Sequence, residues 1–468
     1  MRWTITAIAA LLSAASVQAQ GVSVFAHSGC SLARGGTGVA DPCHDGSAVY
    51  YNPASLALQP GAASLGALAL FTSNEFRFPG GRSVDGEQPV EWAPHLWFAA
   101  RGGPRVGLGL GIWAPYGLST KWPLDFEGRF VGYDNTLRGI YIQPTAAYDV
   151  IPGRLAIGAG IDFVRGSVEI HRRVDLAATN IPGTNTPFSA LGVLRGTDFI
   201  DATVDVDDWT TTFNAGVQVR ASERWSIGVR YLHTANLDLE GDAEFNQLPT
   251  GILLPPGNPL GLPAGTPLDA VLATQFLPNA ALSEQRLETA ITLPNQLVAG
   301  VRYQVTQKVG LLLDYQWTGW SQFDEARLNF ARAPTDTLFL DFDNTSTVRF
   351  GTDITASDRW DVRTGIVWNE AASPDLSVTP LLAEGERLTL SAGAGYRIGR
   401  RFSANAGLEL VFQEERPGIV RPRTTRALGA DDLIAGDYKG SAVVLALTMS
   451  YRLPDMRWLW STEATTDR

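Results

Sequence analysis

Two cysteines, each with a histidine nearby, are the first candidates in this sequence for a reactive or metal-binding site. Cys30 and Cys43 are the only cysteines among the 468 residues, and His27 and His44 flank them. An even cysteine pair in an exported chain predicts a disulfide, here closing a loop of about a dozen residues. The alternative is a metal site, but the spacing fits no familiar zinc pattern and we expect none. The bond would stiffen its segment without taking part in a reaction.

No other group of residues points to catalysis. The remaining histidines, His95, His171 and His233, belong to no recognisable Ser-His-Asp arrangement, and the chain contains no Gly-x-Ser-x-Gly motif. We therefore expect neither an enzyme nor a bound cofactor. The net charge is −11 and the charges are scattered, which provides no basic surface for nucleic acid.

Apolar and polar residues alternate with a period of two over several stretches. In the stretch 360–369, Trp360, Val362, Ile366 and Trp368 fall on one side of the alternation. Successive side chains of a strand point to opposite faces, so this pattern predicts a strand whose apolar face, with an aromatic residue at each end, lies against lipid. The alternation recurs at 388–397, 402–412 and 442–452.

A soluble β-sandwich with one wet face would also alternate. Its polar face usually carries Lys and Glu, whereas the polar positions here are mostly Gly, Ala, Ser and Thr, as a crowded lumen requires. No internal run reaches the roughly eighteen apolar residues of a membrane-spanning helix. We therefore expect an all-β fold, a single large membrane β-barrel.

Tight turns and long loops alternate along the chain. The six turns and seven loops predict about fourteen antiparallel strands, with the long loops outside the cell and both termini in the periplasm. We expect turns at 101–104, 151–153, 221–223, 306–307, 356–358 and 399–400, and loops near 76–90, 119–136, 173–207, 240–285, 322–343, 370–386 and 414–438.

The two ends of the chain differ from the alternating region. Residues 1–19 are typical of a signal peptide, with Arg2 before an apolar core and a cleavage site at Ala19. Export without a stop-transfer helix indicates the outer membrane of a Gram-negative cell. We expect residues 20–60 to form a plug in the lumen, residues 61–453 the barrel, and residues 454–468 a periplasmic tail.

Four short motifs carry a resemblance to a known family. They are Tyr51-Asn52-Pro53-Ala54, Pro115-Tyr116-Gly117-Leu118-Ser119-Thr120, Trp317-Thr318-Gly319-Trp320-Ser321-Gln322-Phe323 and Arg363-Thr364-Gly365-Ile366. In this order, the chain resembles the FadL/TodX outer-membrane transporters of long-chain fatty acids and other hydrophobic compounds. The resemblance implies a plugged barrel that catches its ligand between the two longest external loops, passes it to a lumenal site and releases it sideways at a kinked third strand.

Lateral release has a physical rationale. An acyl chain that entered the periplasm would expose apolar surface to water at a cost of about 0.8 kcal/mol per CH₂, which exit into the bilayer avoids. The resemblance also implies that Asn52 of the plug meets the third strand. The residues that match the family's gate are Asn52, Pro53 and Ala54 in the plug and Pro115, Tyr116, Gly117 and Leu118 at the kink.

The third strand also contains Gly107, Gly109 and Gly111 ahead of Pro115. Gly and Pro inside a strand mark bulges, bends or broken pairing. We expect the three glycines to be small lumen-facing residues that make room for the plug, and the kink to lie between Pro115 and Leu118.

The two longest loops contain more apolar residues than segments in water need. Exposed apolar surface of this size usually binds something, so we expect a groove for substrate between the loops. The alternative is that these residues only pack against one another. The candidate groove residues are Phe188, Leu191 and Leu194 in the first loop and Ile252, Leu253, Leu254, Leu272 and Phe276 in the second.

A fatty carboxylate would require a cation in the lumen. By alternation Arg172 and Arg363 face inward and are the candidates. Lumenal arginines are also commonly paired with acids such as Asp361 or Glu409, which is the structural alternative for both. A neutral aromatic hydrocarbon would need no cation.

We therefore expect a monomeric channel for passive uptake of hydrophobic molecules, with long-chain fatty acids as the first candidate substrate. Its partners would be these small molecules and outer-membrane lipid. Neutral hydrocarbons, either monoaromatics or alkanes, are the alternative substrates. A receptor or adhesin barrel that transports nothing would predict polar external loops, whereas the loop 240–285 is apolar.

Overall fold

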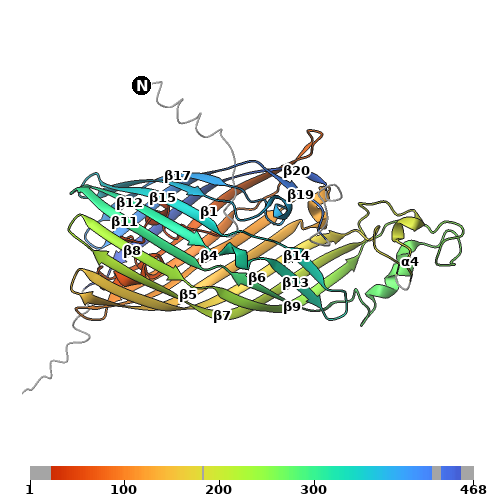
Figure 1. The fold of residues 1–468 in the computed structure, drawn as a ribbon, viewed down its shortest axis with the longest axis horizontal. Coiled ribbons are helices and arrows are strands. Elements are labelled where there is room, and N and C mark those ends of the chain that lie inside the picture. Colours follow the sequence, from red (N-terminus) through yellow and green to blue (C-terminus); the bar gives the residue numbers. More distant parts are fainter. Residues whose placement is uncertain (1–22, 182–183, 424–433, 455–468) are drawn as a thin grey trace, which may run out of the picture.

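The structure, a computed structural model, describes residues 23–181, 184–423 and 434–454. These residues form one antiparallel barrel in which each strand pairs with its neighbours and β20 pairs with β1 to close the wall (Figure 1). Fourteen strand positions can be followed in the described part of the chain, and two of them consist of two pieces each, β8 with β9 and β10 with β11. The strands are β1 (Ala62–Arg77), β3 (Glu91–Arg101), β4 (Val106–Lys121), β5 (Asp134–Ile151), β6 (Leu155–Val174), β7 (Ile200–Arg220), β8 (Trp225–Leu232), β9 (Ala235–Gln247), β10 (Gln285–Leu293), β11 (Gln296–Thr306), β12 (Val309–Thr318), β15 (Thr345–Thr355), β16 (Trp360–Asn369), β17 (Arg387–Ile398), β18 (Phe402–Gln413) and β20 (Ala435–Arg452).

The connections confirm the expected alternation of turns and loops. The six predicted turns lie together at one end, called the turn end, and the long connections lie at the other, called the loop end (Figure 1). The expected loop 322–343 is wrong in part, because it contains a β-hairpin. Short elements at the loop end are β2 (Ser83–Asp85), η2 (Glu127–Phe130), η3 (Phe188–Leu191), α4 (Leu268–Leu272), η4 (Ala273–Phe276), η5 (Trp320–Gln322), β13 (Glu325–Phe330), β14 (Asp336–Phe339), η6 (Asp375–Ser377) and β19 (Arg416–Ile419).

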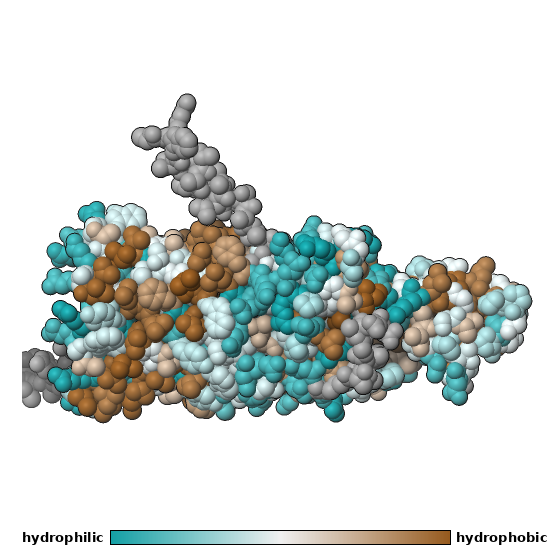
Figure 2. Space-filling model, turned by 45° about the horizontal axis from the view of Figure 1, so that its top comes forward, coloured by the Kyte–Doolittle hydropathy of each residue, from teal (hydrophilic) through white to brown (hydrophobic). Residues whose placement is uncertain are grey.

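The outer face of the barrel carries an apolar band. Figure 2 shows the hydrophobic residues gathered over the part of the barrel nearer the turn end, while the part nearer the loop end is mostly hydrophilic. Aromatic side chains border such bands where lipid meets water. Exposed aromatic residues are Trp225, Trp360 and Phe402 close to the turns and Trp92, Trp209 and Trp368 farther along the strands. Trp360, Val362, Ile366 and Trp368 all face outward, as the alternation predicted.

The segment that precedes β1 lies inside the barrel. It contains α2 (Gly29–Ala33), α3 (Ala48–Tyr51) and η1 (Pro53–Ala57), whose residues are all buried. We call residues 23–60 the plug. The predicted signal peptide and nearly all of the predicted tail lie outside the described residues. Within the described residues, no helix is long and apolar enough to cross a membrane.

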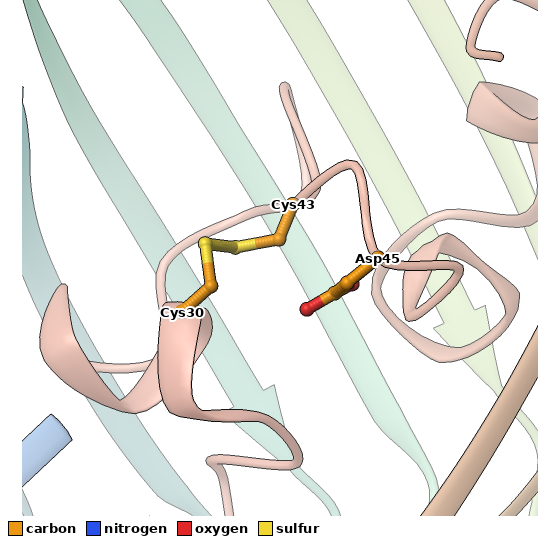
Figure 3. Close-up of side chains that lie close together, drawn as sticks. All are labelled: Cys30, Cys43 and Asp45. Carbon is orange, nitrogen blue, oxygen red and sulfur yellow. A yellow bond between two sulfur atoms is a disulfide. The ribbon is translucent and has the colours of Figure 1, made fainter. Parts of the chain in front are cut away.

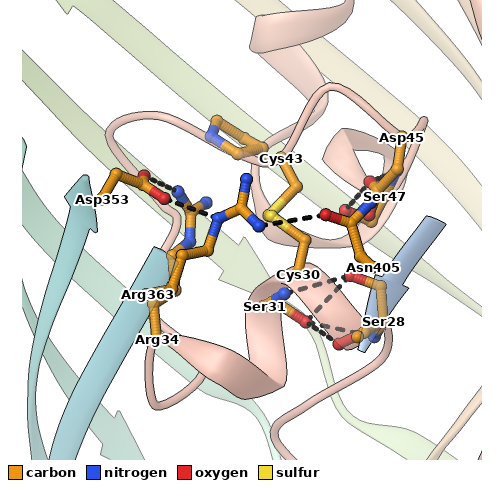
Figure 4. Close-up of a disulfide and its surroundings, with 12 residues drawn as sticks. Ser28, Cys30, Ser31, Arg34, Cys43, Asp45, Ser47, Asp353, Arg363 and Asn405 are labelled. Atoms are coloured by element: carbon orange, nitrogen blue, oxygen red, sulfur yellow. Dashed lines mark hydrogen bonds and ion pairs between the residues drawn. A yellow bond between two sulfur atoms is a disulfide. The ribbon is translucent and has the colours of Figure 1, made fainter. Parts of the chain in front are cut away.

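Polar contacts and one disulfide fix the plug. The expected bond between Cys30 and Cys43 is present, and Arg34 of the plug shares the Asp353 carboxylate of β15 with Arg363 of β16, each at 2.7 Å (Figure 4).

Asp314, a buried acid on β12, binds the backbone of the plug. Its carboxylate accepts hydrogen bonds from the N–H groups of Gly38 and Val39, at 2.7 and 3.1 Å. These contacts satisfy backbone groups that a short irregular segment would otherwise leave unpaired.

Glycines of β4 let the plug approach the wall. A Cβ atom on Gly107 would lie 2.3 Å from the backbone of Leu56, and one on Gly109 would lie 2.6 Å from the side chain of Val49. A Cβ atom on Gly111 would lie 2.5 Å from the Trp97 ring. Heavy atoms cannot approach so closely, so these positions accept only glycine without a shift of the plug or of Trp97.

Candidate functional site

The barrel wall parts between β3 and β4. The two strands pair only over Leu96–Arg101 and Gly107–Ile112, and from Glu91 to His95 β3 pairs with β1 alone. Trp92, on the part of β3 that does not pair with β4, is 67% exposed on the outer face. The gap therefore opens at the level of the apolar band, toward its loop-end border.

A bulge in β4 accompanies the gap. The register between β4 and β5 shifts between Trp113 and Tyr116, which leaves Ala114 and Pro115 without pairing partners in β5. Proline has no N–H to donate, and a bulge bends its strand. The sequence placed the kink at Pro115 to Leu118, but residues 116–118 pair regularly with β5, so the irregularity is one residue earlier and shorter than predicted.

The plug occupies the edge of β4 that β3 leaves free. Ser23 forms an antiparallel bridge with Tyr116, and the N–H of Val24 donates to the carbonyl of Pro115 at 2.8 Å. The first described residues of the plug thus extend the sheet at the point where the wall is interrupted.

An apolar cavity of about 70 Å³ lies behind this segment. Two charged residues, Arg387 of β17 and Glu409 of β18, line it together with apolar side chains. Arg387 is 2% exposed, and its Nε donates to the Gln413 side chain at 3.2 Å. The apolar lining consists of Val24, Phe25, Ala26, Leu68, Leu70, Val367, Val411, Ala442 and Val444.

Sequence reasoning did not single out Arg387 as a site residue. The signal was available, because Arg387 directly precedes Leu388 in an alternating stretch and must therefore face the lumen when Leu388 faces lipid. Glu409 was recognised as an inward acid, but the alternation of a single strand does not show which residues line a cavity with it.

The two predicted lumenal arginines do not form one site. Arg172 lies at the loop end and binds Asp336 of β14 at 2.6 Å. Arg363 lies near the turn end, where it binds Asp353 at 2.7 Å and the Asn405 side chain at 3.0 Å. Both guanidinium groups are therefore engaged by acids, which is the structural alternative considered for them.

The salt bridge of Arg172 changes the titration of its partner. Burial alone would raise the pKa of the Asp336 carboxyl, but the adjacent Arg172 guanidinium and its hydrogen bond outweigh burial and hold that pKa below its usual value.

The candidate groove residues of the two longest loops gather only in part. Phe188, Leu191, Leu254 and Leu272 are buried in one cluster, with Ile252 and Phe276 packed against it. Leu194 and Leu253 face solvent instead, at 77% and 60% exposure. The two loops thus pack on each other beyond the barrel rim, where Figure 1 shows the segment around α4 standing clear of the strands.

The plug motif meets a different strand from the one expected. The Asn52 amide donates to the carbonyls of Val39, at 2.7 Å, and of Val217 in β7, at 3.0 Å. A Cβ atom on Gly158 of β6 would lie 2.5 Å from the backbone of Pro53, beside Ala54. The expectation that Asn52 meets the third strand is therefore wrong for its hydrogen bonds, which go to the plug and to β7. The plug reaches the third strand through Leu56 of η1 instead, beside Gly107.

Three potential metal ligands lie close together in the plug. Cys30, Cys43 and Asp45 offer ligand atoms within 4.8 Å of one another (Figure 3). The two sulfur atoms are bonded to each other, so neither is available as the thiolate that a metal would require.

Comparison with known proteins identifies the family. The family model described as outer membrane protein transport protein (OMPP1/FadL/TodX) matches residues 5–453. A long-chain fatty acid transport protein of Escherichia coli O6:H1 is 26% identical over 446 residues, covering 88% of this chain and 92% of that protein.

Solved structures agree on the fold. The crystal structure of a Pseudomonas aeruginosa FadL homologue superposes with a TM-score of 0.77 at 19% identity, covering 92% of this chain and 99% of that one. The Ralstonia pickettii toluene transporter TbuX superposes with a TM-score of 0.63 at 20% identity, with the same coverage. The chain therefore belongs to the OMPP1/FadL/TodX family, as a non-enzymatic β-barrel of the Gram-negative outer membrane that transports hydrophobic compounds across it.

Proposed function

We propose that the protein takes up long-chain fatty acids passively, as a monomer, and releases them sideways into the membrane. The observation that carries the proposal is the gap between β3 and β4, which opens at the level of the apolar band beside an apolar cavity. Long loops of outer-membrane barrels face the cell exterior, so substrate would arrive at the loop end. Residues 1–19 would be removed as the signal peptide.

The loops at the entrance supply an apolar surface. The cluster around Phe188 and Leu272 joins the two longest loops, and the exposed Leu194 and Leu253 extend it to the outside. An acyl chain that partitions onto this surface leaves water before it enters the barrel, at a gain of about 0.8 kcal/mol per buried CH₂.

Arg387 is the residue that we propose for the carboxylate, in place of Arg172 and Arg363. It lines the apolar cavity next to the gap, where a guanidinium group can bind a carboxylate with two parallel hydrogen bonds. The apolar side chains around it would contact the part of the acyl chain next to the carboxylate. A neutral hydrocarbon would use the same cavity without the arginine, and similarity to a toluene transporter keeps that substrate as the second candidate.

Binding measurements on the refolded protein test the assignment. We expect Arg387→Gln to weaken binding of a C18 fatty acid by about 10- to 100-fold, because a hydrogen bond to a charged group contributes about 1.5–3 kcal/mol. Toluene binding should stay unchanged, which shows that the variant folds. The matched control is Arg286→Gln, since Arg286 is an exposed arginine of β10 that pairs with Glu240 on the outer face.

Two results would contradict the proposal. Fatty acid affinity that is equal in the wild type and in Arg387→Gln, together with tight toluene binding, would assign the site to neutral hydrocarbons. Binding of neither compound would leave a receptor barrel as the better interpretation.

A further inference from the structure

The side chain of Tyr116 crosses the lumen. Its strand, β4, is separated from β10 and β11 in the sheet by β5, β6, β7 and the β8–β9 position. Nevertheless the Tyr116 hydroxyl donates to the carbonyl of Pro294, between β10 and β11, at 2.6 Å. A Cβ atom on Gly139 of β5 would likewise lie 3.2 Å from the Leu293 side chain. The two walls therefore meet at this level.

A shared break in two strands provides the acceptor. Leu293 pairs with Ala235, and Gln296 pairs with Leu232, so the residues between them leave the ladder in both strands at the same level. Proline cannot donate a ladder hydrogen bond, and its position in the break leaves its carbonyl available to a side chain.

Gln296 makes the second contact with the tyrosine. Its Nε2 donates to the Tyr116 hydroxyl at 2.9 Å, and its Oε1 accepts from Nη2 of Arg230 in β8 at 2.6 Å. Because a guanidinium group only donates, the amide orientation is fixed and the tyrosine hydroxyl accepts from Gln296 while it donates to Pro294. Tyr116, Gln296 and Arg230 are each at most 2% exposed.

The plug is part of the same network. The Arg230 guanidinium lies 4.3 Å from the centroid of the Tyr50 ring, and the Tyr50 hydroxyl is 3.4 Å from Oε1 of Gln296. Tyr116 therefore connects to the plug through Gln296 on one side and through its bridge with Ser23 on the other.

An aromatic cluster lies against the Tyr116 ring. Trp320 packs on it edge to face, with the centroids 6.1 Å apart, and is itself packed by Phe323 and Phe342. Trp320 and Phe323 belong to the motif 317–323, to which the proposed transport path assigns no role. The motif thus packs its Trp320 ring against the Tyr116 ring and helps to fix its orientation.

We propose that Gln296 is a positioning residue that holds Tyr116 across the lumen and thereby closes the passage from the loop-end interior to the gap beside β4. This inference rests on the proposed function and names its gate. The acyl chain of a fatty acid offers no replacement hydrogen bonds, so its passage requires the contacts of Tyr116 with Pro294 and Gln296 to open. Substitutions of Gln296 should then change the rate of passage without changing capture at the loops.

The test combines uptake with a distance that does not depend on transport. Gln296→Leu removes one hydrogen bond of Tyr116 and should raise the maximal rate of fatty acid uptake into proteoliposomes about fivefold, since a buried hydrogen bond contributes about 1 kcal/mol. Tyr116→Phe removes both of them and should raise that rate about 25-fold. The half-saturating concentration should stay the same. Gln296→Glu keeps the acceptor for Arg230 but replaces the donor to Tyr116 with an acceptor that competes with Pro294 for the hydroxyl proton, so its uptake should lie between those of the wild type and Gln296→Leu. Gln304→Leu, on the same strand near the turn end, is the control.

Spin labels at Arg138 of β5, which pairs with Gly117 of β4, and at Leu297 of β11 report the distance between the two walls where Tyr116 joins them. We expect one narrow distance distribution in the wild type and Gln304→Leu, and a broader one in Gln296→Leu. An unchanged distance distribution in Gln296→Leu would contradict the proposed positioning of Tyr116 by Gln296, whether or not the protein transports. A broadened distance distribution in a protein that takes up no fatty acid would support the positioning role of Gln296 and reject the proposed function.

Discussion

At the residue scale, ion pairs at the two ends of the barrel have different neighbours. Arg363 lies beside the plug and shares Asp353 with Arg34, whereas Arg172 joins a wall strand to the β13–β14 hairpin through Asp336. The first pair is enclosed by barrel and plug. The second lies at the loop end, where the Asp336 side chain is 38% exposed, and it is therefore accessible to changes in pH.

Acid should release the β13–β14 hairpin. Since the folded pKa of Asp336 is lowered, its pair stabilises the hairpin fully above the unfolded pKa of about 3.9, and this stability is lost as pH falls through the lower folded pKa. We expect a spin label at Thr335 to become more mobile over that acid range. In Asp336→Asn the label should be mobile at every pH, and a pH-dependent transition that persists in this variant would contradict the assignment.

At the element scale, the plug is a short irregular segment whose order depends on its attachments. The disulfide closes a loop with a sequence separation of 13, and the backbone N–H groups of Gly38 and Val39 within that loop bind Asp314. The barrel strands, in contrast, are held by a closed ladder of backbone hydrogen bonds.

Loss of the disulfide should loosen the plug and leave the barrel intact. For Cys30→Ser with Cys43→Ser we expect the plug to lose about 3 kcal/mol of local stability, because a loop of this length gains that much from cross-linking. Hydrogen exchange at Gly38 and Val39 should accelerate accordingly, while amides of β16 and β17 keep their protection. Equal exchange of the plug amides in both proteins would show that the polar contacts alone fix the plug.

Local patterns predicted the strands but not every break in them. The period of two located the turns and the lipid-facing side chains, because both follow from the geometry of a single strand. The break at Pro294 has a visible signal, Leu293-Pro294-Asn295, but its partner break in β8–β9 depends on the neighbouring strand. The strand contacted by Asn52 and the cavity around Arg387 depend on packing across the lumen, which no local pattern contains.

At the scale of the whole molecule, the barrel is longer than its apolar band. The hydrophilic part near the loop end continues the wall beyond the apolar band, and the lobe around α4 lies beyond it (Figure 2). Through the cluster around Leu272, that lobe packs on the loop between β6 and β7 and on the loop-end tips of β7 and β9, at Ile200, Ala202 and Phe245. The barrel wall itself is held by strand pairing. Removal of the lobe therefore breaks none of the described strand pairs of the wall.

Removal of the lobe should impair capture alone. We expect replacement of residues 250–282 by a short Gly-Ser linker to leave thermal unfolding of the barrel unchanged. Uptake at low fatty acid concentration should fall about tenfold, equivalent to about 1.4 kcal/mol of lost affinity, and recover at high concentration. A control replaces the exposed residues 79–82 between β1 and β2. Uptake that is insensitive to the lobe would move the capture site into the barrel.

On the proposed route, the end of β3–β4 pairing at Ile112 also determines what receives the substrate. A molecule that leaves there enters the hydrocarbon of the membrane, so the bilayer itself is the acceptor phase. Net flux then depends on a partition equilibrium between the surroundings of the cell and its outer membrane, and it continues only while a later step withdraws the molecule from the lipid. The protein accordingly sets how fast this equilibrium is reached, while the chemistry of the cell interior sets its direction.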